Sequence, residues 1–213
     1  INVADMESVR FFANGFIMHE MNPASNWRAD ESLRAALLRQ KIPAIAGIDT
    51  RALTSHLRDK GTQKSYLAVE GRVGEKDAVR KARGWCGLDG QDYAARVSCR
   101  APFAFDPDGS ITLSWGIATG LPPADLKIVA FDFGIKWNIL RSLRRSGMAV
   151  TVVPATTPAS EVLAMKPDGV FLSNGPADPA AVTYAVDAAR QLLGKVPIMG
   201  ICLGHQLLGL AVG

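Results

Sequence analysis

The chain has 213 residues, 48% of them hydrophobic and 21% charged, which is enough to bury the core of one large domain or two modest ones. Its formal net charge is +4, and its Lys and Arg residues are scattered rather than clustered, which argues against a nucleic-acid-binding protein. No apolar run is long enough to span a membrane, so we expect a soluble globular protein with neither nucleic acid nor membrane as its partner.

Residues 1–123 show an irregular pattern of short apolar segments. We expect strands at 15–18, 44–48, 65–69 and 110–115. We expect helices after Asp30, with Leu33, Leu37 and Leu38 on one face, after Thr50, with Leu53 and Leu57 on one face, and at 75–83. The turn-forming segment 120–123 then indicates a domain boundary.

From residue 126 onward, apolar strands and amphipathic helices alternate regularly. We expect strands at 127–131, 148–153, 169–172 and 197–201, and helices at 136–145, 158–165, 180–193 and from Leu203. This alternation predicts a doubly wound parallel sheet. Ligands bind such sheets beyond the carboxyl ends of the strands, so the loops at 132–137, 173–179 and around Cys202 should share one rim.

The clearest chemical motif is G-x-C-x-G at residues 200–204, the thiol counterpart of the G-x-S-x-G nucleophile elbow. Glycines on either side of Cys202 allow neighbouring backbone to pass closely. The following helix points its N-terminus at the sulfur and so favours the thiolate. The N–H of Leu203 can face a developing oxyanion. A buried structural cysteine is the alternative, which the two glycines and the helix start disfavour.

The loop after the strand at 169–172 reads S-N-G-P-A-D-P. Its Gly and Pro residues fix an unusual backbone path, which an oxyanion hole needs and which an ordinary tight turn also has. Its place on the same rim as Cys202 favours the functional interpretation. The other two cysteines, Cys86 and Cys99, have neither metal nor disulfide spacing, which is typical of the reducing cytoplasm and predicts no metal site.

Four motifs together resemble a known family. Residues 200–206 resemble the nucleophile motif of class I glutamine amidotransferases, and residues 173–176 resemble their oxyanion loop. The stretches I-A-G-I-D-T-R at 45–51 and F-D-F-G-I-K-W-N-I-L-R at 131–141 are similar to the small chain of carbamoyl-phosphate synthase. This resemblance implies a mixed α/β small-chain N-terminal domain at 1–123. It implies a flavodoxin-like glutaminase domain, incomplete at its C-terminus, at 125–213.

The resemblance also implies the chemistry. Cys202 would attack the side-chain amide carbon of L-glutamine while the N–H groups of Gly175 and Leu203 hold the oxyanion. Ammonia would leave, and water would hydrolyse the remaining thioester to glutamate. Gly175, Leu203, Ala177 and Gln206 would bind the glutamine.

In the family, ammonia passes through a tunnel to a large chain. That partner uses bicarbonate, ATP and Mg to make carbamoyl phosphate for arginine and pyrimidine biosynthesis. The resemblance therefore implies a cytoplasmic heterodimer in which this chain holds no cofactor. In agreement, the sequence contains neither G-x-x-x-x-G-K-[ST] nor G-x-G-x-x-G.

The sequence departs from the family in two respects. Ala177 stands where the family usually has Gly, and alanine at a position of positive φ would be strained by about 1 kcal/mol, weakening glutamine binding. The family's general base is a His, oriented by a Glu, in a segment after the elbow. His205 has no such role in the family, and we expect His19 and His56 to be surface or packing residues. We therefore interpret the chain as a fragment cut at both ends and inactive by itself.

Two alternatives remain. One is another class I amidotransferase, or a cysteine hydrolase on the same fold; the stretch at 45–51 argues against it. The other is a non-catalytic docking or regulatory subunit, which the incomplete set of catalytic residues favours.

Overall fold

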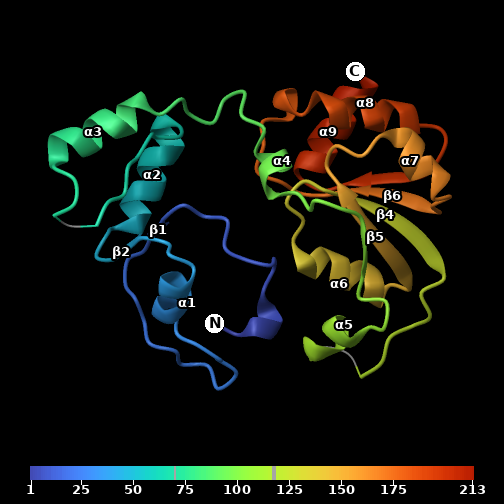
Figure 1. Cartoon of the computed structure of the whole chain (residues 1–213), viewed down its shortest axis with the longest axis horizontal. Helices are drawn as coiled ribbons and strands as arrows, with labels where there is room; N and C mark the ends of the chain where they lie inside the picture. The colour runs from blue at the N-terminus through green and yellow to red at the C-terminus, as the bar shows by residue number, and fades with distance from the viewer. Residues whose placement is uncertain (70, 117–118) are drawn as a thin grey trace. The chain divides into compact units, whose positions relative to one another are not determined.

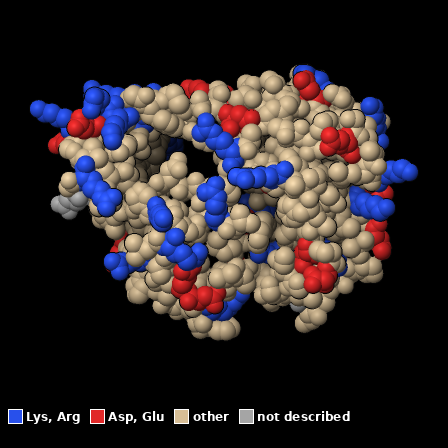
Figure 2. Space-filling model, viewed as in Figure 1, with Lys and Arg blue, Asp and Glu red and all other residues tan. Residues whose placement is uncertain are grey.

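The computed structural model describes residues 1–69, 71–116 and 119–213. Contacts between Cα atoms divide the chain into a first unit, Ile1–Gly87, and a second unit, Leu88–Gly213. Figure 1 labels the elements of both units, which we describe separately. On the face shown in Figure 2, Lys and Arg are dispersed among uncharged residues, with Asp and Glu between them, as their scattered positions in the sequence predict.

The first unit contains a two-stranded parallel sheet and short helices. Strand β1 (Phe16–Ile17) pairs with β2 (Ala44–Ile45), so both predicted strands form but are shorter than expected. The helices are η1 (Val3–Asp5), α1 (Leu33–Arg39), α2 (Thr50–Lys60) and α3 (Glu75–Gly84). The predicted strand at 65–69 is absent from this described segment, where Tyr66 and Val69 are exposed.

Helix starts in the first unit differ from the prediction by one or two residues. Ser32, not Asp30, caps α1, because its Oγ accepts a hydrogen bond from Ala35 N at 3.2 Å while Asp30 accepts from Val3 N at 2.8 Å. Asp49, not Thr50, caps α2 by accepting from Ala52 N at 2.9 Å. Leu37 is buried as predicted, but Leu38 is 65% exposed.

The second unit is built on a five-stranded sheet in the order β3-β5-β4-β6-β7. Its strands are β3 (Phe103–Phe105), β4 (Leu126–Asp132), β5 (Met148–Pro154), β6 (Gly169–Leu172) and β7 (Ile198–Gly200). All neighbouring pairs are parallel except β3 and β5. The parallel part has the order of a flavodoxin-like sheet, which confirms the predicted α/β class.

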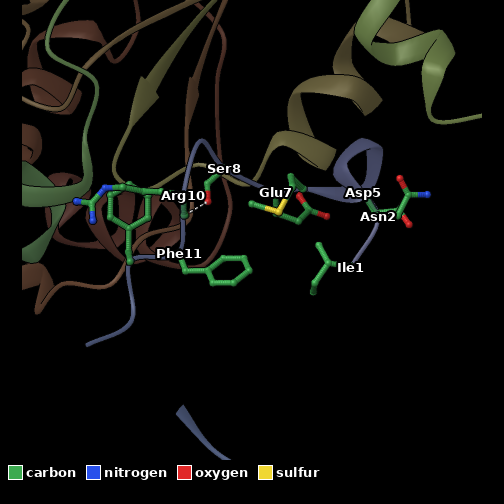
Figure 3. Close-up of a pocket in the computed structure, with 9 residues that line it drawn as sticks. Ile1, Asn2, Asp5, Glu7, Ser8, Arg10 and Phe11 are labelled. Atoms are coloured by element: carbon green, nitrogen blue, oxygen red, sulfur yellow. Dashed lines mark hydrogen bonds between the residues drawn. The ribbon is translucent and has the colours of Figure 1, made fainter. Parts of the chain in front are cut away.

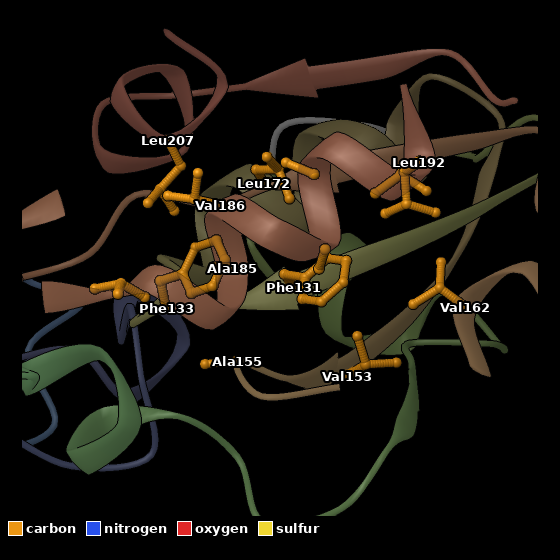
Figure 4. Close-up of a cluster of buried hydrophobic side chains, with 14 of the residues drawn as sticks. Phe131, Phe133, Val153, Ala155, Val162, Leu172, Ala185, Val186, Leu192 and Leu207 are labelled. Atoms are coloured by element: carbon orange, nitrogen blue, oxygen red, sulfur yellow. The ribbon is translucent and has the colours of Figure 1, made fainter. Parts of the chain in front are cut away.

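Helices cover both faces of this sheet. Alternate side chains of β4 and β6, such as Phe131 and Leu172, pack with α7 (Ala159–Ala164), α8 (Thr183–Leu192) and α9 (Leu203–Val212), as Figure 4 shows. The side chains between them, Ala130 and Phe171, pack on the other face with α6 (Trp137–Arg145). The unit also contains two short helical segments, α4 (Tyr93–Val97) and η2 (Pro179–Ala181), and the helix α5.

The segment 110–115 was predicted as a strand, and this prediction is wrong. Residues Ser110–Ser114 form helix α5, because the buried carboxylate of Asp106 accepts hydrogen bonds from Ile111 N, Thr112 N and the Thr112 hydroxyl. These bonds hold the first turn of a helix although Ile111, Leu113 and Trp115 alternate as in a strand.

Strand β3 was not predicted, and it bears on the domain division. Ser98 Oγ accepts a hydrogen bond from Ala155 N at 2.8 Å, and β3 pairs with β5 along its length. Residues 88–116 therefore belong to the second unit, whereas the sequence suggested a boundary between residues 123 and 125. No helix in the described part of the chain has both the length and the apolarity to cross a membrane.

Candidate active site

Three loops meet at the carboxyl ends of β4, β6 and β7. The Asn174 side chain donates to Gly134 O at 3.0 Å and accepts from Lys136 N at 3.2 Å, which joins the loop after β6 to the loop after β4. Gly204 N donates to Ser173 O at 3.0 Å, which joins the start of α9 to the loop after β6. The three segments that the sheet topology predicts on one rim therefore lie together.

Cys202 lies at the sharp turn between β7 and α9. It is the N-cap of α9, its side chain is exposed, and its backbone has φ 53° and ψ −112°. Residues with a Cβ rarely adopt this conformation, so the turn is strained. Hydrogen bonds on either side hold it, from Ile201 N to Leu172 O at 3.1 Å and from Gln206 N to Cys202 O at 3.0 Å.

The glycines on either side of Cys202 permit contacts that no other residue would allow. A Cβ atom on Gly204 would overlap the carbonyl oxygen of Leu172 in β6. A Cβ atom on Gly200 would lie 2.5 Å from the carbonyl carbon of Gly204. Since real Cβ atoms do not approach other atoms this closely, both glycines are required for α9 to begin against the end of the sheet.

Gly175 and Leu203, the two predicted oxyanion-hole residues, are neighbours. A Cβ atom on Gly175 would overlap Phe133 O and would lie 2.9 Å from Leu203 Cδ2. Within the described residues, the N–H of neither Gly175 nor Leu203 donates to a protein acceptor. Leu203 is the first residue of α9, where an N–H has no partner inside the helix and the helix dipole favours negative charge. The two donors are thus available to an anionic oxygen.

Gln206 and Ala177 are the remaining predicted site residues, and His205 is the histidine of the motif for which no role is expected. His205 and Gln206 are exposed in the first turn of α9. Ala177 is partly buried against the core between the sheet and α8, and its φ is not positive. The strain expected at Ala177 for a positive φ is therefore absent. In the neighbouring loop after β4, Gly134 has φ 110° and lies opposite Pro176.

The three cysteines are free thiols in different environments. Cys86 and Cys202 are exposed, whereas Cys99 is partly buried. Burial and the neighbouring Asp132 carboxylate raise the pKa of the Cys99 thiol to about 11. Cys99 is thus almost entirely protonated near neutral pH and a poor nucleophile.

Sequence reasoning missed two polar residues that hold the rim together. The buried Asp132 carboxylate accepts from Gly134 N and Ile135 N, each at 2.9 Å, and from Cys99 N at 2.8 Å. Asn174 bridges two loops, as described above. Both are polar residues just at or beyond the carboxyl ends of buried strands, and this position was the signal that could have identified them.

Other features do not compete with this site. A pocket of about 350 Å³ in the first unit is lined by residues between Ile1 and Phe12, where Ser8 Oγ donates to Arg10 O at 2.7 Å (Figure 3). None of the predicted site residues lines it. Among the described residues there is no group of three or more His, Cys, Asp or Glu side chains that could hold a metal ion.

Comparison with known proteins matches both parts of the chain. Residues 129–213 match the family profile "Glutamine amidotransferase class-I", and residues 1–67 match "Carbamoyl-phosphate synthase small chain, CPSase domain". The carbamoyl phosphate synthase small chains of Syntrophotalea carbinolica and Thioalkalivibrio sulfidiphilus are 49% and 47% identical, each covering 100% of this chain and 56% of the relative. The chloroplastic small chain of Oryza sativa is 43% identical, covering 100% of this chain and 47% of the relative.

The chain thus spans about half the length of these curated relatives. Among solved structures, a putative GMP synthase subunit from Thermoplasma acidophilum is 30% identical. The match covers 41% of this chain and 45% of the solved one, with a TM-score of 0.36.

The thiol environments predict an order of alkylation. With iodoacetamide at pH 8, we expect Cys202 to react readily and Cys99 last, because with a pKa of about 11 only roughly one part in a thousand of the Cys99 thiol is thiolate. Labelling of Cys99 should rise as the pH approaches 11. Peptide mapping by mass spectrometry measures each rate, with the exposed Cys86 as internal control. Equal rates for Cys99 and Cys202 at pH 8 would contradict the assignment.

The strained backbone at Cys202 predicts that a Gly variant is more stable than an Ala variant at this position, which is the reverse of the order expected inside a helix. Cys202→Gly should be more stable than Cys202→Ala by about 1 kcal/mol, because glycine adopts positive φ without the Cβ penalty. Urea unfolding at 25 °C measures the difference. The control is His56, exposed in the middle of α2, where the Ala variant should be the more stable of the two. The same order at both positions would show that the turn is not strained.

Proposed function

Because the chain belongs to the carbamoyl phosphate synthase small-chain family, we propose that it is the glutamine-hydrolysing subunit of a carbamoyl-phosphate synthase. The observation that carries the proposal is the pairing of an exposed Cys202, held in a strained turn, with two unused N–H donors next to it. This pairing is what acyl transfer from an amide requires: a positioned nucleophile and donors for the oxyanion.

The proposed reaction begins when the Cys202 thiolate attacks the side-chain amide carbon of glutamine. The carbonyl oxygen becomes an oxyanion that accepts hydrogen bonds from Gly175 N and Leu203 N. The C–N bond then breaks, the nitrogen takes up a proton, and ammonia leaves a thioester on Cys202. Water hydrolyses the thioester to glutamate and restores the thiol. Gly175, Ala177, Leu203 and Gln206 are the proposed contacts of the bound glutamine.

The proton transfers of this reaction need a general acid–base. Of the three histidines, His205 alone belongs to the second unit, and it lies only three residues after Cys202 on the same helix. His205 is exposed in the first turn of α9, and the family gives the histidine of this motif no base role. We therefore assign the base to a His–Glu pair outside these 213 residues, as in the family, and propose that the 213 residues alone are inactive.

The proposed partner is a large synthetase chain, to which ammonia would be channelled. That chain would use ATP, Mg and bicarbonate to make carbamoyl phosphate, and this chain would need no cofactor of its own. The names of the relatives support the partnership. The three free thiols suit a reducing compartment, and we propose the cytoplasm.

One observation favours a second candidate, a non-catalytic docking or regulatory subunit. The second unit contains a single histidine, His205, so the 213 residues hold no complete set of catalytic residues. The match of residues 1–67 to the small-chain profile argues against other class I amidotransferases and against stand-alone cysteine hydrolases.

Ammonia release from glutamine separates the two candidates. We expect turnover by the protein expressed from its complete reading frame, a loss of at least about a thousand-fold in Cys202→Ala, and none by residues 1–213 alone. Turnover should survive His205→Asn with at most a modest loss. Turnover by residues 1–213 that vanishes in His205→Asn would show that His205 is the base. No turnover by the complete protein would favour the docking subunit.

The backbone at Ala177 predicts that this departure from the family is harmless. In the complete protein, Ala177→Gly should leave KM for glutamine within about two-fold, because no strain is relieved, and should lower stability by about 0.5–1 kcal/mol through the freer unfolded chain. Steady-state kinetics and urea unfolding measure the two effects. A clearly lower KM in Ala177→Gly would show that alanine strains the bound form of the loop.

A further inference from the structure

We propose that Ser173 and Asn174 are positioning residues that orient the N–H of Gly175 toward the oxyanion. Gly175 N belongs to the same peptide plane as the carbonyl of Asn174. In a trans peptide the N–H and C=O point in opposite directions, so whatever holds one fixes the other. This inference deepens the proposed function and rests on it.

The carbonyl side of this peptide is held by a buried hydroxyl. Ser173 Oγ donates to Asn174 O at 2.8 Å and accepts from Phe133 N at 2.9 Å. Ser173 is 0% exposed, so water does not compete for these bonds. The Asn174 carbonyl is thereby turned toward the sheet, which leaves the Gly175 N–H directed away from it.

The Asn174 side chain anchors the Cα atom at the carbonyl end of this peptide. Its Nδ2 donates to Gly134 O at 3.0 Å and its Oδ1 accepts from Lys136 N at 3.2 Å. The side-chain amide thus makes to the backbone of residues 134–136 the same kind of donor and acceptor hydrogen bonds that a neighbouring strand would make. Rotation of the 174–175 peptide must break the Ser173–Asn174 hydrogen bond, while the Asn174 side chain fixes the Cα atom from which this peptide starts.

The segment that receives these bonds is itself fixed. Asp132 accepts from Gly134 N and Ile135 N, so the loop after β4 is closed around a buried carboxylate. Gly134 has φ 110°, and a Cβ atom there would lie 3.0 Å from Pro176 Cδ. The loop after β6 therefore packs against a loop whose backbone is held by hydrogen bonds. Precise placement of an oxyanion donor requires such support.

Two substitutions test the proposal in the protein expressed from its complete reading frame. Asn174→Asp keeps the shape and the acceptor but removes the donor to Gly134 O, and Ser173→Ala frees the carbonyl of Asn174. For each, we expect kcat for glutamine hydrolysis to fall about 10-fold to 100-fold with KM within about three-fold, because an oxyanion donor acts mainly in the transition state.

A second measurement separates positioning from general damage to the fold. Alkylation of Cys202 by iodoacetamide forms no oxyanion, so its rate should stay within about two-fold of the unsubstituted protein. The matched control is Asp168→Ala, which removes the acceptor of a 2.8 Å hydrogen bond from Lys127 N. This bond also joins the segments of β4 and β6, but at the amino-terminal ends of the strands, opposite the rim. This control should leave kcat unchanged.

The outcomes are distinguishable. Unchanged kcat in both variants would overturn the positioning role while leaving the proposed function intact. A parallel loss of kcat and of Cys202 alkylation, or an equal loss in Asp168→Ala, would also overturn it, because the effect would then be structural. Absence of glutamine hydrolysis by the unsubstituted protein would overturn the proposed function and this inference together.

Discussion

The second unit depends on one close contact, between the start of α9 and the end of β6. Gly204 lies so near Leu172 O that no Cβ atom fits between them, and its N–H bonds to Ser173 O. This contact fixes where α9 begins and forces the chain between β7 and α9 into a turn too sharp for relaxed backbone. The strain at Cys202 follows from it, since the residue that carries the sulfur has φ 53° in this turn.

The strain is tolerated because the elements around it are well anchored. Leu203 and Leu207 are buried in the core between the sheet and its helices, and each contributes on the order of 2 kcal/mol by burial, comparable to the cost of the turn. Hydrogen bonds anchor the loops as well: the side chains of Asp132, Ser173 and Asn174 bind backbone groups of the loop after β4. Apolar packing thus places the helix, and buried hydrogen bonds set the direction of individual peptide groups.

The sequence predicted what depends on local periodicity and missed what depends on partners far along the chain. The strand at 169–172 was predicted to the residue because it is a continuous apolar run buried on both faces. The glycines at 200 and 204 were identified correctly from their spacing. By contrast, α5 depends on the Asp106 carboxylate, and the role of Asn174 depends on a loop about 40 residues earlier. The sequence left open whether position 177 needs a positive φ, because backbone conformation in a loop depends on contacts that local sequence does not specify; the φ of Ala177 is not positive.

The fixed start of α9 also limits how this motif can change in length. Each residue added to a helix turns everything beyond it by about 100° and advances it by about 1.5 Å. With Gly204 held against Leu172, a residue inserted between Gly200 and Gly204 would have to be absorbed in the turn, moving the sulfur off the rim or lifting the helix from the sheet. Loops elsewhere in the chain, such as the segment at 61–69, carry no such restriction. The spacing of the five residues 200–204 is therefore as strict a requirement as their identity.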